Sequence, residues 1–310
     1  MRHAWSASVL ALLAGLIIGM LVDRAAERPV VERAGFRVLE GDFHVHTRYS
    51  DGLLFPFDVV RVAERAGLDV VGITEHNIIF PAEMAAWFAR VFGGPIVLVG
   101  EEVTTNRFHL IALGLTRNAT YKLPLRSLIE DIHAQGGVAL AAHPVEMYWD
   151  TYAEVIDLLD GAEVVHPIAY RQDRDRGFRY QDMVTFFERH QPSHPKLAAI
   201  GSSDFHGMKA LGISRTYLFV TEASEDGVLE AIRQGQTVAI SPDGRAFGPP
   251  ELVKALEESP LQPRGDYSYA PAGWLDLIGR TLALLGLVGI LAFASRLYDF
   301  EGGPETEVTT

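Results

Sequence analysis

Between residues 36 and 240 the sequence alternates between strand-like and helix-like runs. The strand-like runs are continuously apolar or rich in β-branched residues, and they lie at 36–46, 68–74, 95–104, 108–114, 137–143, 162–166, 197–204 and 216–221. Runs with apolar residues at helical spacing stand between several of them, at 55–67, 123–137, 151–161 and 224–235. Strands that alternate with helices predict an α/β fold with a parallel sheet, open or closed.

The composition supports a sizeable core and limits the chemistry. Of the 310 residues 48% are hydrophobic, and the chain has no cysteine. Disulfides, thiolate metal ligands and cysteine nucleophiles are therefore excluded, and any metal must be held by His, Asp or Glu. The net charge of −13 argues against nucleic acid as a partner, because binding it normally needs a basic face. A small phosphorylated substrate at a cationic metal site is compatible with this charge.

An uncharged apolar run at 4–22 is about long enough to cross a bilayer. We expect this run to be a transmembrane anchor. A cleavable signal peptide is the alternative, although no clear small-residue cleavage site follows the run.

A second apolar segment, 273–294, is expected to form another transmembrane helix. Its core from Thr281 to Ala294 is too short to span alone, and a full span takes in Asp276 and Arg280, which are costly at the centre of a bilayer. Both lie near one end, where side chains reach the headgroups, and Trp274 suits an interface. An amphipathic helix packed on the domain or lying in the interface is the alternative.

Two spans would place both termini on one side of the membrane and the central domain, 36–240, on the other. Residues 241–272 are rich in proline and glycine and are expected to be a linker to the second span. Arg2 favours an extracytoplasmic domain, whereas the arginines that follow the first run oppose it. We expect the extracytoplasmic side.

Histidines and carboxylates recur at the boundaries of the strand-like runs. His44 and His46 lie two residues apart near the end of the first run, so both side chains point to one face of a strand. Asp51 follows in a turn. Later boundaries carry His76, Glu101, Glu102, His109, His143, Asp204 and His206. The carboxyl ends of parallel strands gather at one edge, so we expect these residues to converge and to bind metal.

Six stretches, in this order, resemble the motifs of the polymerase and histidinol phosphatase (PHP) superfamily: "DFHVHTRYSDG", "GITEH", "GEEVTT", "FHLIALG", "AAHP" and "GSSDFHG". The resemblance covers roughly residues 36–240. It implies a distorted seven-stranded β/α barrel with two or three divalent metal ions, zinc, manganese or iron, at a centre that is trinuclear in the family. Members of the superfamily are mainly phosphoesterases.

Carried over by position, the resemblance implies nine metal ligands. The first metal would be held by His44, His46, Glu102 and Asp204, the second by Asp51, His76 and His206, and the third by His109 and His143 with Glu102 shared. Glu102 is chosen over Glu101 because the family's glutamate precedes an aliphatic and then a hydroxyl residue. Glu75, beside His76, should point to the opposite face and support the site or lie at the surface.

Two features depart from the family pattern. Only 33 residues separate His109 from His143, which leaves no room for the substrate-capping insert of many family members. The two apolar segments are also not part of the common pattern.

The expected function is a phosphoesterase that uses a metal-activated hydroxide on a small phosphomonoester or a nucleotide-like phosphodiester. Three ligand carboxylates and two or three divalent ions leave a net positive site, which attracts an anion. No general acid is assigned. Substrate-binding candidates are His166, Arg171, Arg174 and Lys209, and a solvated charged loop is the alternative for the two arginines.

Two other functions remain open. An amidohydrolase-like metal hydrolase also begins with His-x-His on a barrel strand, but it usually needs a bridging lysine, and the corresponding strand ends carry Glu102 and His143. A non-catalytic metal-binding module at the membrane is the third hypothesis. The oligomeric state is not indicated by the sequence.

Overall fold

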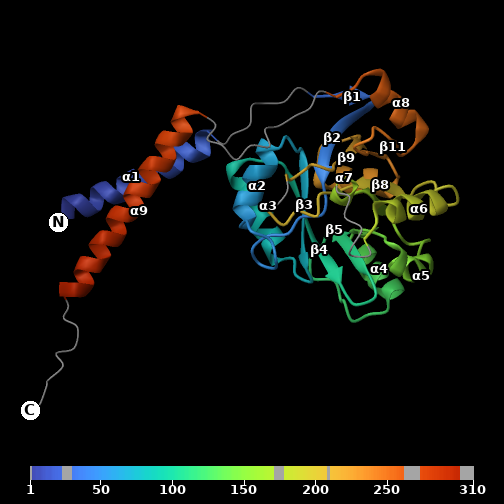
Figure 1. Cartoon of the computed structure of the whole chain (residues 1–310), viewed down its shortest axis with the longest axis horizontal. Coiled ribbons are helices and arrows are strands. Elements are labelled where there is room, and N and C mark those ends of the chain that lie inside the picture. The colour runs from blue at the N-terminus through green and yellow to red at the C-terminus, as the bar shows by residue number, and fades with distance from the viewer. Residues whose placement is uncertain (1, 23–29, 171–177, 208–209, 262–272, 301–310) are drawn as a thin grey trace, which may run out of the picture. The chain divides into compact units, whose positions relative to one another are not determined.

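The computed structural model describes residues 2–22, 30–170, 178–207, 210–261 and 273–300. The chain forms two compact units (Figure 1). One consists of residues 1–24 and 268–310 and contains two helices. The other, residues 25–267, is a mixed α/β unit.

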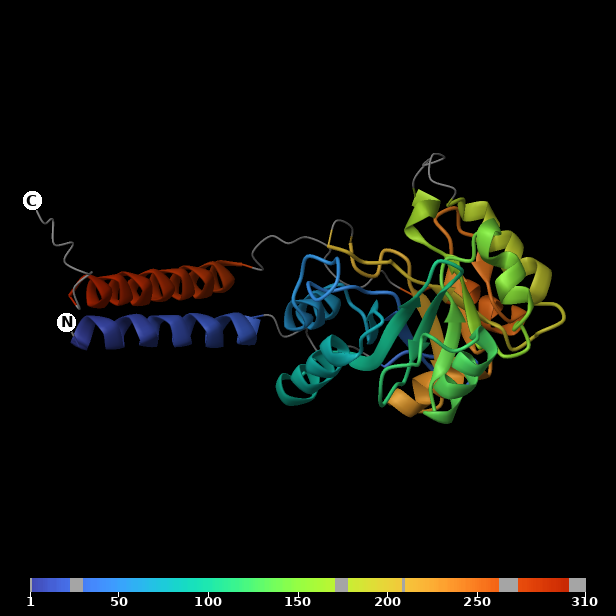
Figure 2. The same cartoon turned by 90° about the horizontal axis from the view of Figure 1, so that it is seen from below.

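In the helical unit, α1 (Arg2–Val22) and α9 (Trp274–Phe300) pack side by side in opposite directions (Figure 2). Glycines allow the close approach: a Cβ on Gly15 would lie 2.4 Å from the backbone nitrogen of Ala283, and one on Gly286 would lie 2.4 Å from that of Leu12. Small residues at such positions are typical of helices that pack in a membrane.

Both helices meet the length and composition needed to cross a membrane, over His3–Val22 and Trp274–Ser295. The two charged residues near the start of α9 pair with each other, since Arg280 Nε lies 2.9 Å from Asp276 Oδ1. This pairing one turn apart lowers the cost of placing both groups close to lipid.

The α/β unit is built on one curved sheet. Its seven central strands are β2 (Phe36–Asp42), β3 (Val70–His76), β4 (Ile96–Thr104), β5 (His109–Leu113), β6 (Val138–Ala141), β7 (Gly161–Val165) and β8 (Ala198–Gly201). Four further strands extend the sheet on the β2 side: β1 (Glu32–Arg33) and β9 (Thr216–Val220) pair with β2, β10 (Thr237–Ile240) pairs with β9, and β11 (Ala246–Phe247) pairs with β10.

The direction of β5 decides which side chains lie at the upper mouth of the barrel, the end at which β2, β3, β4, β6, β7 and β8 terminate. Strands β2, β3 and β4 are mutually parallel, as are β6, β7 and β8, whereas β5 runs antiparallel to both β4 and β6. The first residue of β5, His109, therefore lies at the edge of the sheet where the other six central strands end.

The sheet nearly closes on itself. Beyond the ends of β2 and β8, Val45 pairs with Phe205. The nitrogen of His46 donates to the oxygen of Phe205 at 2.9 Å, and the nitrogen of Phe205 donates to the oxygen of His44 at 3.0 Å. The expected distorted seven-stranded β/α barrel with terminal apolar helices is thus confirmed.

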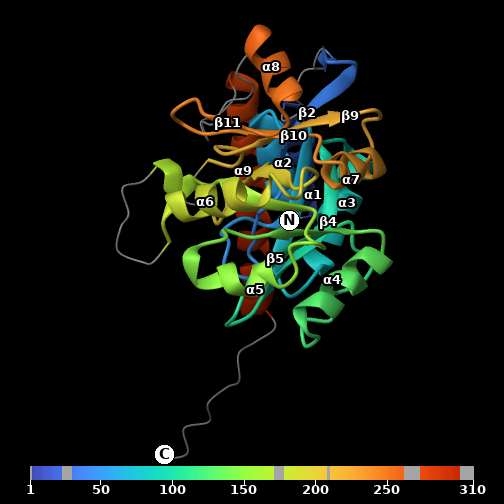
Figure 3. The same cartoon turned by 90° about the vertical axis from the view of Figure 1, so that its right-hand side faces the viewer.

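Helices cover the outside of this barrel, as Figure 3 shows for α3 and α6 on opposite sides. They are α2 (Pro56–Arg65), α3 (Phe80–Phe92), α4 (Leu125–Ala134), α5 (Trp149–Ala153), α6 (Tyr180–His190), α7 (Glu225–Arg233) and α8 (Pro250–Glu258), with single 3₁₀ turns at Glu146–Tyr148 and Pro167–Tyr170. Buried aliphatic and aromatic side chains fill the space between helices and sheet. All eight predicted strands are present.

Two expectations differ from the structure. The helix expected at 151–161 is α5 only as far as Ala153, and turns follow it, in which Val155 and Leu159 still reach the core. These two residues are four apart and both pack into the core, although no continuous helix connects them. The expected linker at 241–272 contains β11 and α8, because Leu252 and Leu256 bury an apolar face against the sheet; its residues 262–272 lie outside the described part of the chain.

The packing of α1 on α9 can be tested by cross-linking, because the chain has no cysteine of its own. A Cβ on Gly279 would lie 3.2 Å from the Cβ of Ile18, close to the separation in a disulfide, about 3.8 Å. The double variant Ile18→Cys, Gly279→Cys should therefore form an intramolecular disulfide on mild oxidation, detected by gel mobility. Adding Gly286→Leu should prevent it by separating the helices. A pair that stays reduced in the parent background would contradict the packing.

Candidate metal centre

The carboxylate of Glu102, near the end of β4, lies among imidazoles from four strands. Its Oε1 is 2.8 Å from His109 Nδ1 and 3.3 Å from His143 Nε2. Its Oε2 is 2.8 Å from His76 Nδ1. His44 and His46 approach the same carboxylate at 3.5 and 3.7 Å. Each of these histidines stands at a strand boundary on the upper mouth, so the fold itself produces the convergence.

Around Glu102 the candidate ligands fall into three groups. The ligand atoms within each group lie within 4.8 Å of one another: His44, His46 and Glu102; His46, Asp51, His76 and His206; Glu102, His109 and His143. Asp204 joins the first group, with Oδ1 3.4 Å from His44 Nε2 and 3.5 Å from His46 Nε2. All nine residues taken from the sequence are brought together, in nearly the grouping expected, with His46 close to two groups.

The second group is the most open to solvent. Asp51 Oδ2 lies 3.1 Å from His206 Nε2 and 3.5 Å from His76 Nε2. The Asp51 side chain is 54% exposed, whereas those of His44 and Glu102 are 0% and 1% exposed. The centre is therefore buried at His44 and Glu102 and exposed to solvent at Asp51.

The donor set fits divalent cations. His44 Nε2 is buried, points between Glu102 and Asp204, and has no hydrogen-bond partner among the described residues. A buried nitrogen aimed between two carboxylates is the arrangement expected for a ligand, and His, Asp and Glu are ligands that zinc, manganese and iron accept.

The electrostatics of the protein alone favour a cation here. Burial by itself would raise the pKa of Glu102, but the imidazoles of His44, His109 and His143 hold it well below its usual range. Burial would lower the pKa of His44, but Glu163, Asp204 and Glu102 raise it well above its usual value. The carboxylates therefore stay ionised, and protons compete with a metal for the imidazoles.

Glu163, in β7, positions two of the histidines and was not anticipated from the sequence. Its side chain is fully buried, with Oε1 3.0 Å from His44 Nδ1. Its Oε2 accepts a hydrogen bond of 2.5 Å from the backbone nitrogen of His143. Holding Nδ1 of His44 turns Nε2 toward the centre, which is the usual role of a carboxylate behind a ligating histidine.

Asp42, at the end of β2, is a second unanticipated carboxylate. It accepts hydrogen bonds from the backbone nitrogens of Ser203, at 2.9 Å, and Gly212, at 2.8 Å. Burial raises its pKa to about 6. Asp42 thereby ties the segment that carries Asp204 to the strand that carries His44. A lone acidic residue in an apolar strand was the available sequence signal for Glu163.

The neighbouring glutamates Glu75 and Glu101 lie outside the three groups. Glu75 is buried and accepts from the backbone nitrogen of Thr47 at 2.7 Å, and it also contacts the hydroxyls of Thr47 and Ser50, so it braces the loop that leads to Asp51. Glu101 accepts from the nitrogen of Ala119 at 2.6 Å, and burial raises its pKa to about 7. Both lie on the opposite face of the sheet from their neighbours His76 and Glu102, as alternation along a strand requires.

Two of the candidate ligands have unusual backbone angles. His143 and Asp204 have φ values of +25° and +45°, a region that residues with a Cβ rarely adopt. Such conformations persist where the surroundings enforce them, often at functional sites. The hydrogen bonds that the backbone nitrogen of His143 donates to Glu163 and that of Ser203 donates to Asp42 supply that enforcement.

Of the substrate-binding candidates, only His166 is in the described part of the chain. It is buried behind the mouth, with Nε2 3.4 Å from Asp204 Oδ2 and its ring 5.9 Å from that of His143. Arg171, Arg174 and Lys209 lie outside the described residues.

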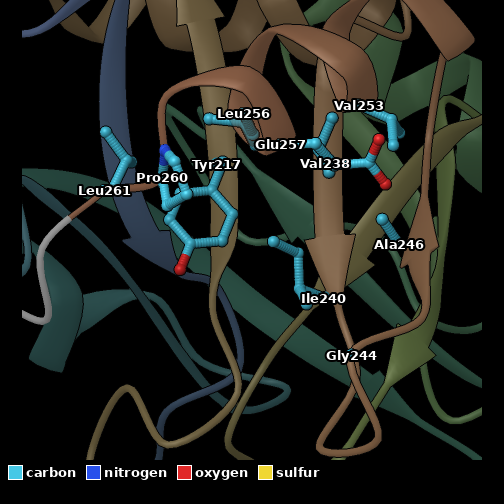
Figure 4. Close-up of a pocket in the computed structure, with 10 residues that line it drawn as sticks. All are labelled: Tyr217, Val238, Ile240, Gly244, Ala246, Val253, Leu256, Glu257, Pro260 and Leu261. Carbon is cyan, nitrogen blue, oxygen red and sulfur yellow. The ribbon is translucent and has the colours of Figure 1, made fainter.

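A separate apolar pocket of about 220 Å³ lies between β9, β10, β11 and α8 (Figure 4). Tyr217, Val238, Ile240, Val253 and Leu256 are among its lining residues. None of the nine candidate ligands lines this pocket, and Glu257 is the one acidic residue among the described residues that line it. The chemistry therefore belongs to the mouth of the barrel and not to this pocket.

The fold of the α/β unit is similar to that of a solved structure. A two-domain protein of Bacteroides vulgatus, described as containing a predicted PHP-like metal-dependent phosphoesterase, superposes with a TM-score of 0.60 over 76% of this chain and 74% of that one, at 22% identity. The α/β unit thus has the PHP-like barrel fold. A lesion-specific endonuclease of Pyrococcus furiosus gives a TM-score of 0.44 at 16% identity, over 63% of this chain and 56% of that one, which is too distant to bear on function.

A sequence relative defines the family more narrowly. The chain is 32% identical over 148 residues to an uncharacterised protein of Methanocaldococcus jannaschii, in an alignment covering 44% of this chain and 85% of the archaeal protein. The chain belongs to the family of this archaeal protein. No protein-family model matches the chain.

Metal binding should release protons. The pKa values of His44, His76 and His143 are raised in the metal-free protein, by carboxylates that include Glu102, and a ligating imidazole must be neutral. Affinity for zinc or manganese should therefore fall as the pH is lowered. Calorimetric titrations in two buffers of different ionisation enthalpy should give different apparent heats. Identical heats in both buffers, with affinity independent of pH, would contradict this competition.

Replacing Glu163 should weaken metal binding without removing a ligand. Glu163→Gln weakens the hold on His44 Nδ1, and loss of such a supporting carboxylate typically costs about 10–100-fold in metal affinity. Glu101→Gln is the matched control, because Glu101 is equally buried but lies on the opposite face of the sheet from Glu102. Competition with a chelating dye gives both affinities. Equal affinities for the two variants would show that Glu163 does not position the ligands.

Proposed function

We propose that the chain is a membrane-anchored, metal-dependent phosphoesterase of the PHP superfamily. The observation that carries the proposal is the convergence of nine histidine and carboxylate side chains on one mouth of a barrel, around Glu102. We propose two or three divalent ions, of zinc, manganese or iron. When bound, they would supply an activated water and stabilise charge on a phosphoryl group.

The protein's own residues define how a substrate would approach. The site is buried at His44, Glu102 and Glu163 and exposed at Asp51, so a phosphate ester would enter from the Asp51 side. Asp51, Glu102 and Asp204 contribute three negative charges, which two or three divalent ions exceed, so the loaded site attracts an anion. We propose a small phosphomonoester or a nucleotide-like phosphodiester as substrate.

His166 is the described side chain best placed to act beside the ligands. Its contact with Asp204 Oδ2 orients the imidazole at the back of the mouth. We propose that His166 orients Asp204 and can donate to a phosphate oxygen held there. Hydrolysis of this kind needs no covalent intermediate on a side chain.

We also propose that α1 and α9 both cross the bilayer. Their length, apolar composition and close packing through Gly15 and Gly286 support this arrangement. Both termini would then lie on one side of the membrane and the barrel on the other. We propose the extracytoplasmic side for the barrel, from the arginine near the N-terminus.

Hydrolysis is tested with two histidine variants of the purified full chain. After reconstitution with zinc or manganese, the parent protein should release phosphate or phenolate from a panel of phosphate esters. His44→Ala should reduce the rate to background, because it removes a ligand. His133→Ala is the control: its ring pairs with Asp160 at 2.8 Å, away from the mouth, and the rate should be unchanged. A metal-loaded parent protein that is inert toward the whole panel would refute the proposal.

A further inference from the structure

Helix α3 carries apolar side chains on the face turned away from the barrel. Phe80, Met84, Trp87 and Val91 follow at spacings of four, three and four residues, so they share one face of the helix. Phe80, Trp87 and Val91 are 50%, 53% and 55% exposed. The inward face consists of small buried residues, Ala82, Ala85, Ala86 and Ala89. A helix that is apolar on both faces is normally covered on both.

The loop before α2 carries further exposed apolar residues, and one of them, Tyr49, contacts α3. Tyr49, Leu53 and Phe55 are 47%, 55% and 51% exposed. The Tyr49 ring meets the Phe80 ring edge-on, with centroids 6.0 Å apart. Together these residues form the α3 patch, defined as Tyr49, Leu53, Phe55, Phe80, Met84, Trp87 and Val91. A cluster of large apolar side chains on the surface of a folded domain marks a contact surface.

The composition of the α3 patch fits the headgroup region of a bilayer. Tryptophan, tyrosine and phenylalanine are the side chains that enter this region. Two arginines accompany the patch: the guanidinium of Arg48 lies 5.8 Å from the Phe55 ring centroid, and Arg90 of α3 is exposed and lies 3.8 Å from Glu225. An arginine can lay its stem on an apolar surface while its charge reaches lipid phosphates.

The chain's own sequence brings a bilayer within reach of this surface. Seven residues, 23–29, separate α1 from the first described residue of the α/β unit, and eleven, 262–272, separate the last described residue of that unit from the start of the α9 segment. Even fully extended, segments of these lengths reach only about 25 and 40 Å. The barrel is thus confined to within about one domain diameter of whatever membrane α1 and α9 cross.

We propose that the α3 patch docks into the headgroup region of the bilayer that α1 and α9 cross. This inference rests on the proposed membrane anchoring and is independent of the proposed hydrolysis. Tyr49 belongs to the same loop as Asp51, and Phe80 follows His76 by four residues. Docking therefore holds the open side of the metal centre at the lipid surface.

The absence of cysteine makes every introduced cysteine a unique labelling site. Nitroxide labels are attached to the full chain at Trp87→Cys, Val91→Cys and Leu53→Cys, in nanodiscs of phosphatidylcholine and phosphatidylglycerol. Collision rates with oxygen, which concentrates in lipid, and with a water-soluble nickel chelate are measured by electron paramagnetic resonance. Gln181→Cys on α6, on the other side of the barrel (Figures 1 and 3), is the aqueous control, and Leu16→Cys on α1 reports the anchoring itself.

Docking predicts that labels at 87, 91 and 53 have an oxygen-to-nickel ratio at least several-fold above that at 181 and approaching that at 16. Three labelled positions are used because a single substitution could disturb the fold. Retained metal binding shows that each variant is folded. If the label at residue 16 is in lipid but the labels in the α3 patch give the same oxygen-to-nickel ratio as the label at residue 181, the patch faces water and the proposal fails. Labels shielded from both reagents would indicate a protein contact and also overturn it. A label at 16 that matches 181 removes the anchoring and the docking with it, without bearing on hydrolysis.

Discussion

The buried carboxylate of Glu102 is the interaction on which the rest of the site depends. A charge of this kind, 1% exposed, would be expensive to bury alone. Five imidazoles approach within 3.7 Å of its oxygens, and they keep its pKa far below the usual range. The mouth of the barrel is thereby a buried region rich in nitrogen and oxygen donors, several of which lie within reach of one another. Divalent cations satisfy both sets at once, which is the physical reason for assigning a metal centre to this mouth.

The barrel delivers these side chains because of two details of its topology. Reversal of β5 brings His109 to the edge where the other central strands end. Pairing of Val45 with Phe205 closes the ring, so that Asp204 and His206 face His44 and His46 across the seam. Glu163 and Asp42 then fix what the strands have brought together, by holding His44 Nδ1 and the backbone of Ser203. Strand order sets the neighbourhood of each ligand, and buried carboxylates behind the ligands set its orientation.

Much of this arrangement could be predicted from the sequence, and the exceptions have physical reasons. Strands β2 to β9 and the convergence of the nine candidate ligands were predicted, because apolar runs and the residues at their ends are local patterns; the short strands β1, β10 and β11 were not. Glu163 was missed because its role depends on which strand lies beside β6, and no single-strand pattern reports that. Helix α3 was missed because it is apolar almost all round and shows little periodicity. Helix α8 was hidden in a proline-rich stretch, where Pro249 precedes the helix and Pro250 begins it.

The central claim is that the nine side chains hold a common cluster of cations. Crystals of the full chain soaked with zinc or manganese, measured at the absorption edge of the metal, test it most directly. The account predicts two or three anomalous peaks at the upper mouth, each about 2.0–2.2 Å from histidine nitrogens and carboxylate oxygens, with Glu102 shared between two of them. A well-ordered mouth with no anomalous peak among His44, Glu102 and Asp51 after soaking would contradict it.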